Sequence, residues 1–206
     1  YHMPEQSQRP GPGGSNRIGQ PEFAIPPGIL KTPDGIAFDA RGIVYPSGNR
    51  ERGPGTPFVP DFTVRQPIGI PVLQSAAQLH FLHAAMIPGR NASTVGEEIG
   101  QSLVHYADGS SEVLLIRAGI DVDDWKPTRE PPLDDTEIIP TPEGVMAAPV
   151  VGWGGFAGAG MDEVTTTLFV TSWTNPKPDV RIESIDFTSS GGRTIRPFLV
   201  ALTLAP

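Results

Sequence analysis

The sequence predicts an all-β protein: a single β-sandwich of jelly-roll type that follows an extended Pro/Gly-rich N-terminal arm. Short apolar stretches separated by turn residues recur from about residue 35 to the end of the chain, as is typical of sandwiches and jelly rolls. No stretch carries the apolar period of a helix of three turns. The 24 Gly and 24 Pro among 206 residues indicate many turns and one extended segment.

Residues 1–34 are the predicted arm, "YHMPEQSQRPGPGGSNRIGQPEFAIPPGILKTPD". Pro and Gly interrupt it throughout and few large apolar side chains are present, so the segment has little capacity to fold alone. Because the sequence starts at Tyr1 rather than at Met, we expect that a leader has been removed or that the sequence is a fragment. The apolar exceptions are expected to dock the arm on a partner protein: Phe23, Ile25, Ile29 and Leu30.

The sandwich domain is expected over residues 35–206, and its first strands lie in two apolar segments. Residues 36–45, "IAFDARGIVY", alternate loosely between apolar and polar side chains. Residues 78–87, "QLHFLHAAMI", place His80 and His83 on opposite faces of a strand, because successive side chains of a strand alternate.

Asp108-Gly109 lies between two apolar runs, "SLVHYA" and "EVLLIRA". Such a dipeptide between two strand-like segments predicts a β-hairpin. We therefore expect antiparallel strands near residues 102–107 and 111–117, with an exposed turn in which glycine supplies a positive φ.

Four later segments complete the predicted strands: "VMAAPVVGW", "VTTTLFVTSW", "DVRIESIDF" and "RPFLVALTLA". In the third, the apolar phase flips, which predicts a bulge near Glu183-Ser184. In the fourth, alternation predicts that one face is shared by Phe198, Val200, Leu202 and Leu204. The total is about eight to ten strands.

Six phrases in order resemble a β-sandwich domain that recurs in large bacterial multidomain proteins: "FDARGIV", "LHFLHA", "HYADGS", "DVDDW", "SWTNPKPDVRIESIDF" and "PFLVALTL". This uncharacterised domain is similar to the galactose-binding-like jelly rolls of carbohydrate-binding modules. The resemblance covers about residues 28–204. It implies a jelly roll and supplies no activity or catalytic residue, and this chain has Lys126 where the family has a second Trp after "DW".

The sequence offers little for catalysis. His80, His83 and His105 are expected to be half-buried and hydrogen-bonded to neighbouring backbone groups rather than to bind metal, since His80 and His83 face opposite ways. No nucleophile-elbow pattern is present, and "GWGGFAGAG" lacks the Gly-Lys-Ser/Thr of a phosphate loop. We therefore expect no enzyme, no catalytic residue and no cofactor.

An acidic, Pro-rich loop is predicted over residues 121–144. A solvated surface is the favoured interpretation of its carboxylates, and a structural calcium ion is the alternative, although the spacing lacks the glycine and glutamate of an EF-hand loop. Paired carboxylates for glycoside hydrolysis are a further alternative, but the loop lacks an evident framework to raise the pKa of one of them. We therefore assign no catalytic or metal site to these residues: Asp121, Asp123, Asp124, Asp134 and Asp135.

Trp125, Trp153 and Trp173 have two interpretations. Tryptophan dominates burial in small β domains, so packing in the core or at its rim is favoured. Stacking on sugar rings is the alternative, and it would make the chain a carbohydrate-binding module.

The leading functional prediction is a non-catalytic structural or protein-interaction subunit of a larger assembly outside the cytoplasm, in the periplasm or at the cell surface. The partners are other protein subunits, with a glycan as the alternative. The formal net charge of −8 and the lack of a Lys/Arg run argue against nucleic acid. No apolar run approaches the roughly 20 residues that a membrane span needs.

Overall fold

The computed structural model describes residues 25, 27–44, 46, 48–49, 60–61, 68–87, 94–125, 150–157, 164–190 and 195–206. Over these ranges the chain forms a series of β-strands: β1 (Gly28–Lys31), β2 (Ala37–Ala40), β3 (Gly48–Asn49), β4 (Pro60–Asp61), β5 (Ile68–Gln74), β6 (Gln78–Met86), β7 (Glu98–Tyr106), β8 (Ser111–Arg117), β9 (Val150–Ala157), β10 (Val164–Thr174), β11 (Ile182–Ser189) and β12 (Arg196–Ala205). The described residues include no helix long and apolar enough to cross a membrane.

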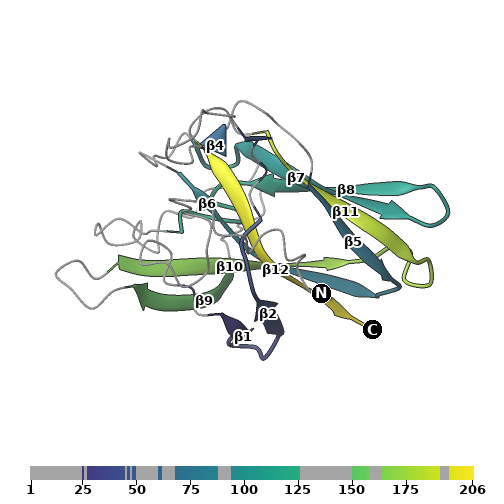
Figure 1. Cartoon of the computed structure of the whole chain (residues 1–206), viewed down its shortest axis with the longest axis horizontal. Coiled ribbons are helices and arrows are strands. Elements are labelled where there is room, and N and C mark those ends of the chain that lie inside the picture. Colours follow the sequence, from purple (N-terminus) through teal and green to yellow (C-terminus); the bar gives the residue numbers. More distant parts are fainter. Residues whose placement is uncertain are drawn as a thin grey trace.

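Two four-stranded antiparallel sheets make up most of the molecule (Figure 1). The first, which we call the β6 sheet, has the order β12-β6-β10-β9, and the second, the β7 sheet, has the order β5-β11-β7-β8. Two smaller pairs, β1-β2 and β3-β4, lie beside them. The predicted all-β, sandwich-like fold with antiparallel sheets packed together is confirmed.

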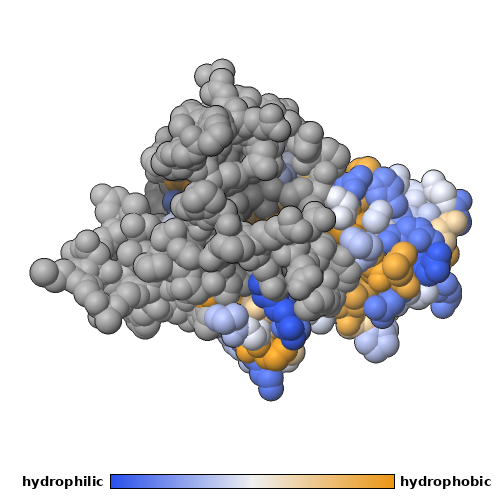
Figure 2. All heavy atoms as spheres, viewed as in Figure 1, coloured by the Kyte–Doolittle hydropathy of each residue, from blue (hydrophilic) through white to orange (hydrophobic). Residues whose placement is uncertain are grey.

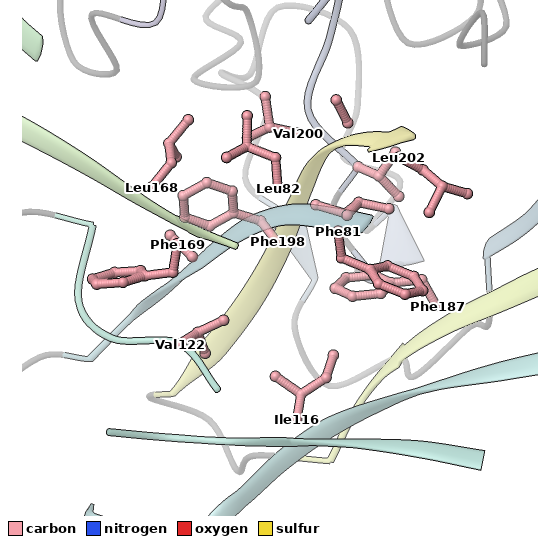
Figure 3. Packing of buried hydrophobic residues seen from close by; sticks show 14 of the residues in the cluster. Phe81, Leu82, Ile116, Val122, Leu168, Phe169, Phe187, Phe198, Val200 and Leu202 are labelled. Atoms are coloured by element: carbon pink, nitrogen blue, oxygen red, sulfur yellow. The ribbon is translucent and has the colours of Figure 1, made fainter. Parts of the chain in front are cut away.

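One hydrophobic cluster joins the two sheets. Figure 3 shows members from both of them: Phe81 from β6, Phe187 from β11 and Ile116 from β8. Phe187 is fully buried and Phe81 nearly so. Burial of large apolar side chains from two facing sheets is the main stabilising contribution in a sandwich, at roughly 25 cal/mol per Å² of apolar surface removed from water.

β6 is buried on both faces, from Leu79 through Ala85. One face points to the β7 sheet, and β2 packs near the other face, against β12. The hydroxyl of Thr203 in β12 donates a hydrogen bond to the carbonyl of Ala37 in β2 at 2.6 Å. Val44 exchanges two backbone hydrogen bonds with Leu199, at 2.7 and 3.0 Å. Val44 therefore extends the β6 sheet at its β12 edge, whereas β2 packs on the face of β12 that carries Thr203.

The predicted boundary between arm and domain, at residues 34 and 35, falls inside a hairpin. β1 pairs with β2 in the register Leu30 opposite Phe38, and Thr32 accepts a hydrogen bond from the amide of Ile36 at 2.9 Å in the turn. The last residues of the predicted arm are thus part of the folded domain. The earlier arm residues, apart from Ile25 and Pro27, lie outside the described residues.

The bulge predicted near Glu183-Ser184 is confirmed, because β11 shifts register between Ile182 and Ser184 against both of its neighbours. A second bulge overturns the predicted face of β12. Its register against β6 shifts between Leu199 and Ala201. The extra residue reverses the alternation, so Phe198 lies opposite Ala84 whereas Leu202 lies opposite Phe81, on the other face of β6.

β5 is a strand that the sequence analysis did not identify. It contains Pro71. Proline has no amide hydrogen to donate to a neighbouring strand, so it is unfavourable in a central strand, which has hydrogen-bonded neighbours on both sides. The structure resolves the conflict because, among the described strands, β5 is the edge of the β7 sheet and pairs with β11 alone. A proline is tolerated where one side of the strand has no partner.

Candidate functional site

The predicted β7-β8 hairpin is confirmed, and its turn is a three-residue loop. The amide of Gly109 donates to the carbonyl of Tyr106 at 3.0 Å, and the amide of Tyr106 donates to the carbonyl of Ser110 at 3.0 Å. Gly109 has φ +82°, a conformation that glycine adopts without strain. A type I turn followed by a left-handed residue matches the right-handed twist of the two strands. Asp108 and Gly109 are exposed, as predicted.

Asp108 ties this turn to the connection between β10 and β11. Its carboxylate accepts hydrogen bonds from the amide of Ser110 at 2.9 Å and from Nζ of Lys177 at 3.1 Å. The Ser110 hydroxyl also donates to Asp108. These donors stabilise the ionised carboxylate, Ser110 more than Lys177, and lower the pKa of Asp108 to about 2.

A buried hydrogen bond between Tyr106 and Asn175 lies next to the same turn. The Tyr106 hydroxyl donates to Oδ1 of Asn175 at 2.6 Å, and Nδ2 of Asn175 donates to the carbonyl of Ala76 at 2.7 Å. Lys177 lies over the Tyr106 ring, with Nζ 5.4 Å from the ring centroid, within the range of a cation–π contact. Burial, with smaller contributions from Glu112 and Asp108, raises the pKa of Tyr106 to about 12. Tyr106 is therefore a neutral donor that joins β7 to the β10-β11 connection.

β8 carries exposed apolar side chains on the outer face of the β7 sheet. Val113 is 54% exposed and Leu115 is 47% exposed. Leu103 of β7 lies directly opposite Val113 and is half-buried. We call Val113, Leu115 and Leu103 the β8 surface. Figure 2 shows hydrophobic residues reaching the exterior among hydrophilic ones at the end of the molecule that holds the β7 sheet.

Polar side chains continue the outer face beyond the β8 surface. Nε2 of His105 lies 2.9 Å from Oδ2 of Asp186, a hydrogen-bonded pair that links β7 to β11. Both side chains are partly exposed. Ser184 is opposite His105 in the register. The outer face of the β7 sheet thus combines an apolar strip at its edge with polar groups toward its centre.

The other two candidate histidines, His80 and His83, are buried on opposite faces of β6, as predicted. Nδ1 of His80 is hydrogen-bonded to Oγ of Ser172 at 2.8 Å, and Nε2 of His83 is hydrogen-bonded to Oγ1 of Thr171 at 2.8 Å. Ser172 and Thr171 are consecutive in β10 and so point to opposite sides. Their partners are cross-strand hydroxyls rather than the backbone groups that we expected.

His83 is the more deeply buried of the two. Its Nδ1 has no hydrogen-bond partner, and burial lowers the pKa of the ring to about 3. Loss of hydration penalises the charged imidazolium. His83 is therefore neutral at ordinary pH, and the structural role assigned to it from the sequence agrees with its surroundings.

Trp125 and Trp173 are partly buried and pack against the hydrophobic cluster. The backbone of Trp125 is held between two strands: its amide donates to the carbonyl of Ala85 at 2.9 Å, and its carbonyl accepts from the amide of Thr167 at 2.8 Å. These positions agree with rim packing. The side chain of Trp153 lies outside the described residues, although its backbone belongs to β9.

The acidic loop is described only for residues 121–125. Asp121 accepts hydrogen bonds from the backbone amide of Arg117 at 2.8 Å and from its Nε at 3.0 Å. Asp123 accepts from the amide of Asp124 at 2.7 Å. In the part of the chain that the structure describes, no three His, Asp or Glu side chains are grouped as a metal site would need. Asp134 and Asp135 lie outside the described residues.

The residues predicted to dock the arm on a partner are not brought together. Ile25 is fully buried and Leu30 is 6% exposed, and both belong to the chain's own hydrophobic cluster. The assignment of these two as partner contacts does not fit their burial. Ile29 is 62% exposed, and Phe23 lies outside the described residues. Only Ile29 of the four is displayed on the surface where the structure describes it.

The β8 surface and the Tyr106–Asn175 contact were not identified from the sequence. In "EVLLIRA", apolar side chains occur in both phases, so one face of β8 had to be exposed or covered by something else. This pattern in the sequence therefore already indicates an exposed apolar face on β8. The Tyr106–Asn175 contact joins residues that are far apart in the sequence, so no local sequence pattern predicts it.

No family model, no curated protein and no solved structure matches this chain.

Proposed function

We propose that this protein is a non-catalytic interaction subunit of a larger protein assembly and that it docks through the β8 surface. The observation that carries the proposal is the exposure of Val113 and Leu115 on the last strand of the β7 sheet. Edge strands ordinarily display polar or charged side chains. Proteins are recognised at such edges by strand addition, in which a partner pairs one of its strands with the edge and its side chains cover the apolar positions.

The non-catalytic part of the proposal has support from the histidines. His80, His83 and His105 each have a hydrogen-bond partner on a neighbouring strand. The partners of His80 and His83 are hydroxyl groups in β10, and both rings are buried. A general acid or base needs access to substrate, which these two rings lack.

The proposal includes the jelly-roll class. If the chain at Val44, which bridges to Leu199 of β12, counts as a strand, the β6 sheet takes the order Val44 strand-β12-β6-β10 with β9 added at the edge. The β7 sheet has the order β5-β11-β7-β8. If the sandwich strands are counted from the Val44 strand and β5 is the second of them, the first strand pairs with the last, β12, and the second pairs with the next to last, β11. This is the pairing scheme of a jelly roll.

Location outside the cytoplasm, in the periplasm or at the cell surface, completes the proposal. Its support is the resemblance to domains of bacterial multidomain proteins. The sequence contains no cysteine, which is compatible with an oxidising compartment.

The test is affinity capture from extracts of the native cells. We expect the wild-type protein to retain specific partner proteins and the Val113→Lys, Leu115→Lys double variant to lose them, because two ammonium groups cannot be buried in an apolar contact. Both positions are exposed, so the variant is expected to fold, which circular dichroism checks.

The matched control is the Gln74→Lys, Gln78→Lys double variant, which adds the same charge at two exposed positions outside β8: Gln74 lies on β5, at the opposite edge of the β7 sheet, and Gln78 lies on β6, in the other sheet. It should retain the partners. Equal capture by the wild type and both variants would remove the β8 surface as the docking site.

A further inference from the structure

We infer that the partner at β8 is a second copy of this chain, and that two β8 strands pair antiparallel about a two-fold axis at Leu114. The two β7 sheets would then form one continuous sheet across the dimer. The inference rests on the proposed function and deepens it by naming the partner. It follows from three features of the described residues: an unprotected edge, a symmetric placement of exposed apolar side chains, and a register without opposed like charges.

The first feature is that β8 lacks the protection seen on other edges. β5 carries Pro71 and a bulge, and Leu73 there has φ +58°, which distorts the edge against further pairing. β12 is bridged at Leu199 by Val44. β8 has no proline and no register shift from Ser111 to Ile116 in its pairing with β7. A regular, partly apolar edge of this length is a template for another strand.

The second feature is symmetry. β8 runs from Ser111 to Arg117, so a two-fold pairing that uses its full length must be centred on Leu114. The exposed residues Val113 and Leu115 flank this midpoint. The two-fold operation therefore places Val113 of one copy opposite Leu115 of the other, twice, on the same face of the sheet. Directly opposed apolar side chains are the stabilising unit of an antiparallel pair.

Shifted registers match less well. Centring the axis on Val113 sets Leu115 against Ser111, and centring it on Leu115 sets Val113 against Arg117. Each shift also shortens the paired segment. The register at Leu114 is the one that opposes the two exposed apolar residues to each other along the whole strand.

The third feature is charge. In the register at Leu114, Glu112 lies opposite Ile116, and Arg117 lies opposite Ser111, so like charges do not meet. The net charge of −8 on each chain opposes association at long range, and salt near 0.15 M screens it beyond about 8 Å.

Sedimentation analysis over a range of protein concentrations tests the dimer. We expect the wild type to shift reversibly from monomer to dimer, and the Val113→Lys, Leu115→Lys double variant to stay monomeric, because each introduced ammonium faces another across the axis. The Val113→Glu, Leu115→Lys double variant should recover the dimer, since each introduced carboxylate faces an ammonium. The Gln74→Lys, Gln78→Lys variant should dimerise like the wild type.

Disulfide capture tests the register. Because the chain has no cysteine, a single introduced thiol is unique. We expect oxidation of an equal mixture of the Val113→Cys and Leu115→Cys variants to give mainly the mixed disulfide, since these positions are opposed. Each variant alone should cross-link about tenfold more slowly or less, because a disulfide needs Cα atoms about 4.4–6.8 Å apart.

A wild type that stays monomeric at every concentration would overturn the inference, as would equal cross-linking of mixed and separate variants. If the wild type is monomeric but still captures other proteins from native extracts through the β8 surface, the proposed function stands and only the second copy is excluded. If the wild type dimerises as predicted but the β8 lysine variant captures the same proteins, the dimer stands and the docking proposal fails.

Discussion

The hydroxyl of Tyr106, at the end of β7, donates a 2.6 Å hydrogen bond to Oδ1 of Asn175, beyond the end of β10. β7 and β10 belong to different sheets, so this buried contact fixes the end of one sheet against the chain that leaves the other. Asn175 extends it to the β5-β6 turn through Ala76. The β8 surface is carried by the hairpin that begins at Tyr106.

Replacement of Asn175 by Ala is expected to destabilise the protein more than replacement of Tyr106 by Phe. The Phe variant loses one hydrogen bond, worth about 1 kcal/mol, while Oδ1 of Asn175 keeps the amide of Lys177 as a donor at 2.9 Å. The Ala variant leaves the Tyr106 hydroxyl and the Ala76 carbonyl without a partner, at roughly 1–3 kcal/mol for each buried group. Urea unfolding at constant m-value measures the difference. Equal losses would show that Asn175 does not join these groups.

Leu30→Ala should lower the free energy of unfolding by about 2–5 kcal/mol, because the side chain is buried and its loss leaves a cavity. Ile29→Ala, the adjacent position, is exposed and should change it by less than about 0.5 kcal/mol. Thermal or urea denaturation compares the two. A similar small effect for both would mean that β1 does not pack on the β6 sheet.

Acid should weaken the wild-type fold through His83. Its pKa is lowered from 6.5 to about 3 in the folded chain, so between these values the unfolded chain binds a proton that the folded chain does not. Stability from this group is therefore complete above pH 6.5 and falls as the pH drops toward 3, by up to about 1.4 kcal/mol per pH unit.

Unfolding free energies at pH 7, 5 and 4 measure this slope for the wild type and for His83→Gln, which does not titrate. The difference between the two should shrink as the pH falls. A wild-type slope unchanged in His83→Gln would contradict the buried neutral histidine.

Trp173→Ala should reduce stability, because Trp173 packs against the core and truncation of a packed aromatic side chain costs up to about 3–5 kcal/mol. We expect no glycan signal that depends on this side chain. A glycan array and a thermal melt give the two measurements. A glycan signal that depends on Trp125, Trp153 or Trp173 without loss of stability would favour the carbohydrate-binding alternative instead.

Gly100→Ala tests the packing between β7, β11 and β12. A Cβ at this position would overlap the carbonyl oxygen of Thr188 and would lie 3.0 Å from Cγ of Pro197, so the backbone must shift, at roughly 1–3 kcal/mol or more. Gly109→Ala should cost about 1 kcal/mol, since the site is open but φ is positive. The order of the two melting temperatures checks the prediction.

The sequence by itself determined the features that local rules specify. Strand periodicity placed His80 and His83 on opposite faces of β6, and the turn chemistry of Asp108-Gly109 located the β7-β8 hairpin. The flip in phase predicted the bulge in β11. Each of these depends on residues close together in the chain, so no knowledge of distant partners was needed.

Only the tertiary structure decided which strand lies at an edge and which apolar side chain is covered. Pro71 is compatible with β5 because that strand has a single neighbour among the described strands, and Val113 and Leu115 are exposed because they lie on the outer face of β8, the other edge of that sheet. Leu30 is buried because β1 folds back with β2 onto the chain's own sheet. A strand's period is the same at an edge and at the centre of a sheet, and long-range pairing alone sets its place.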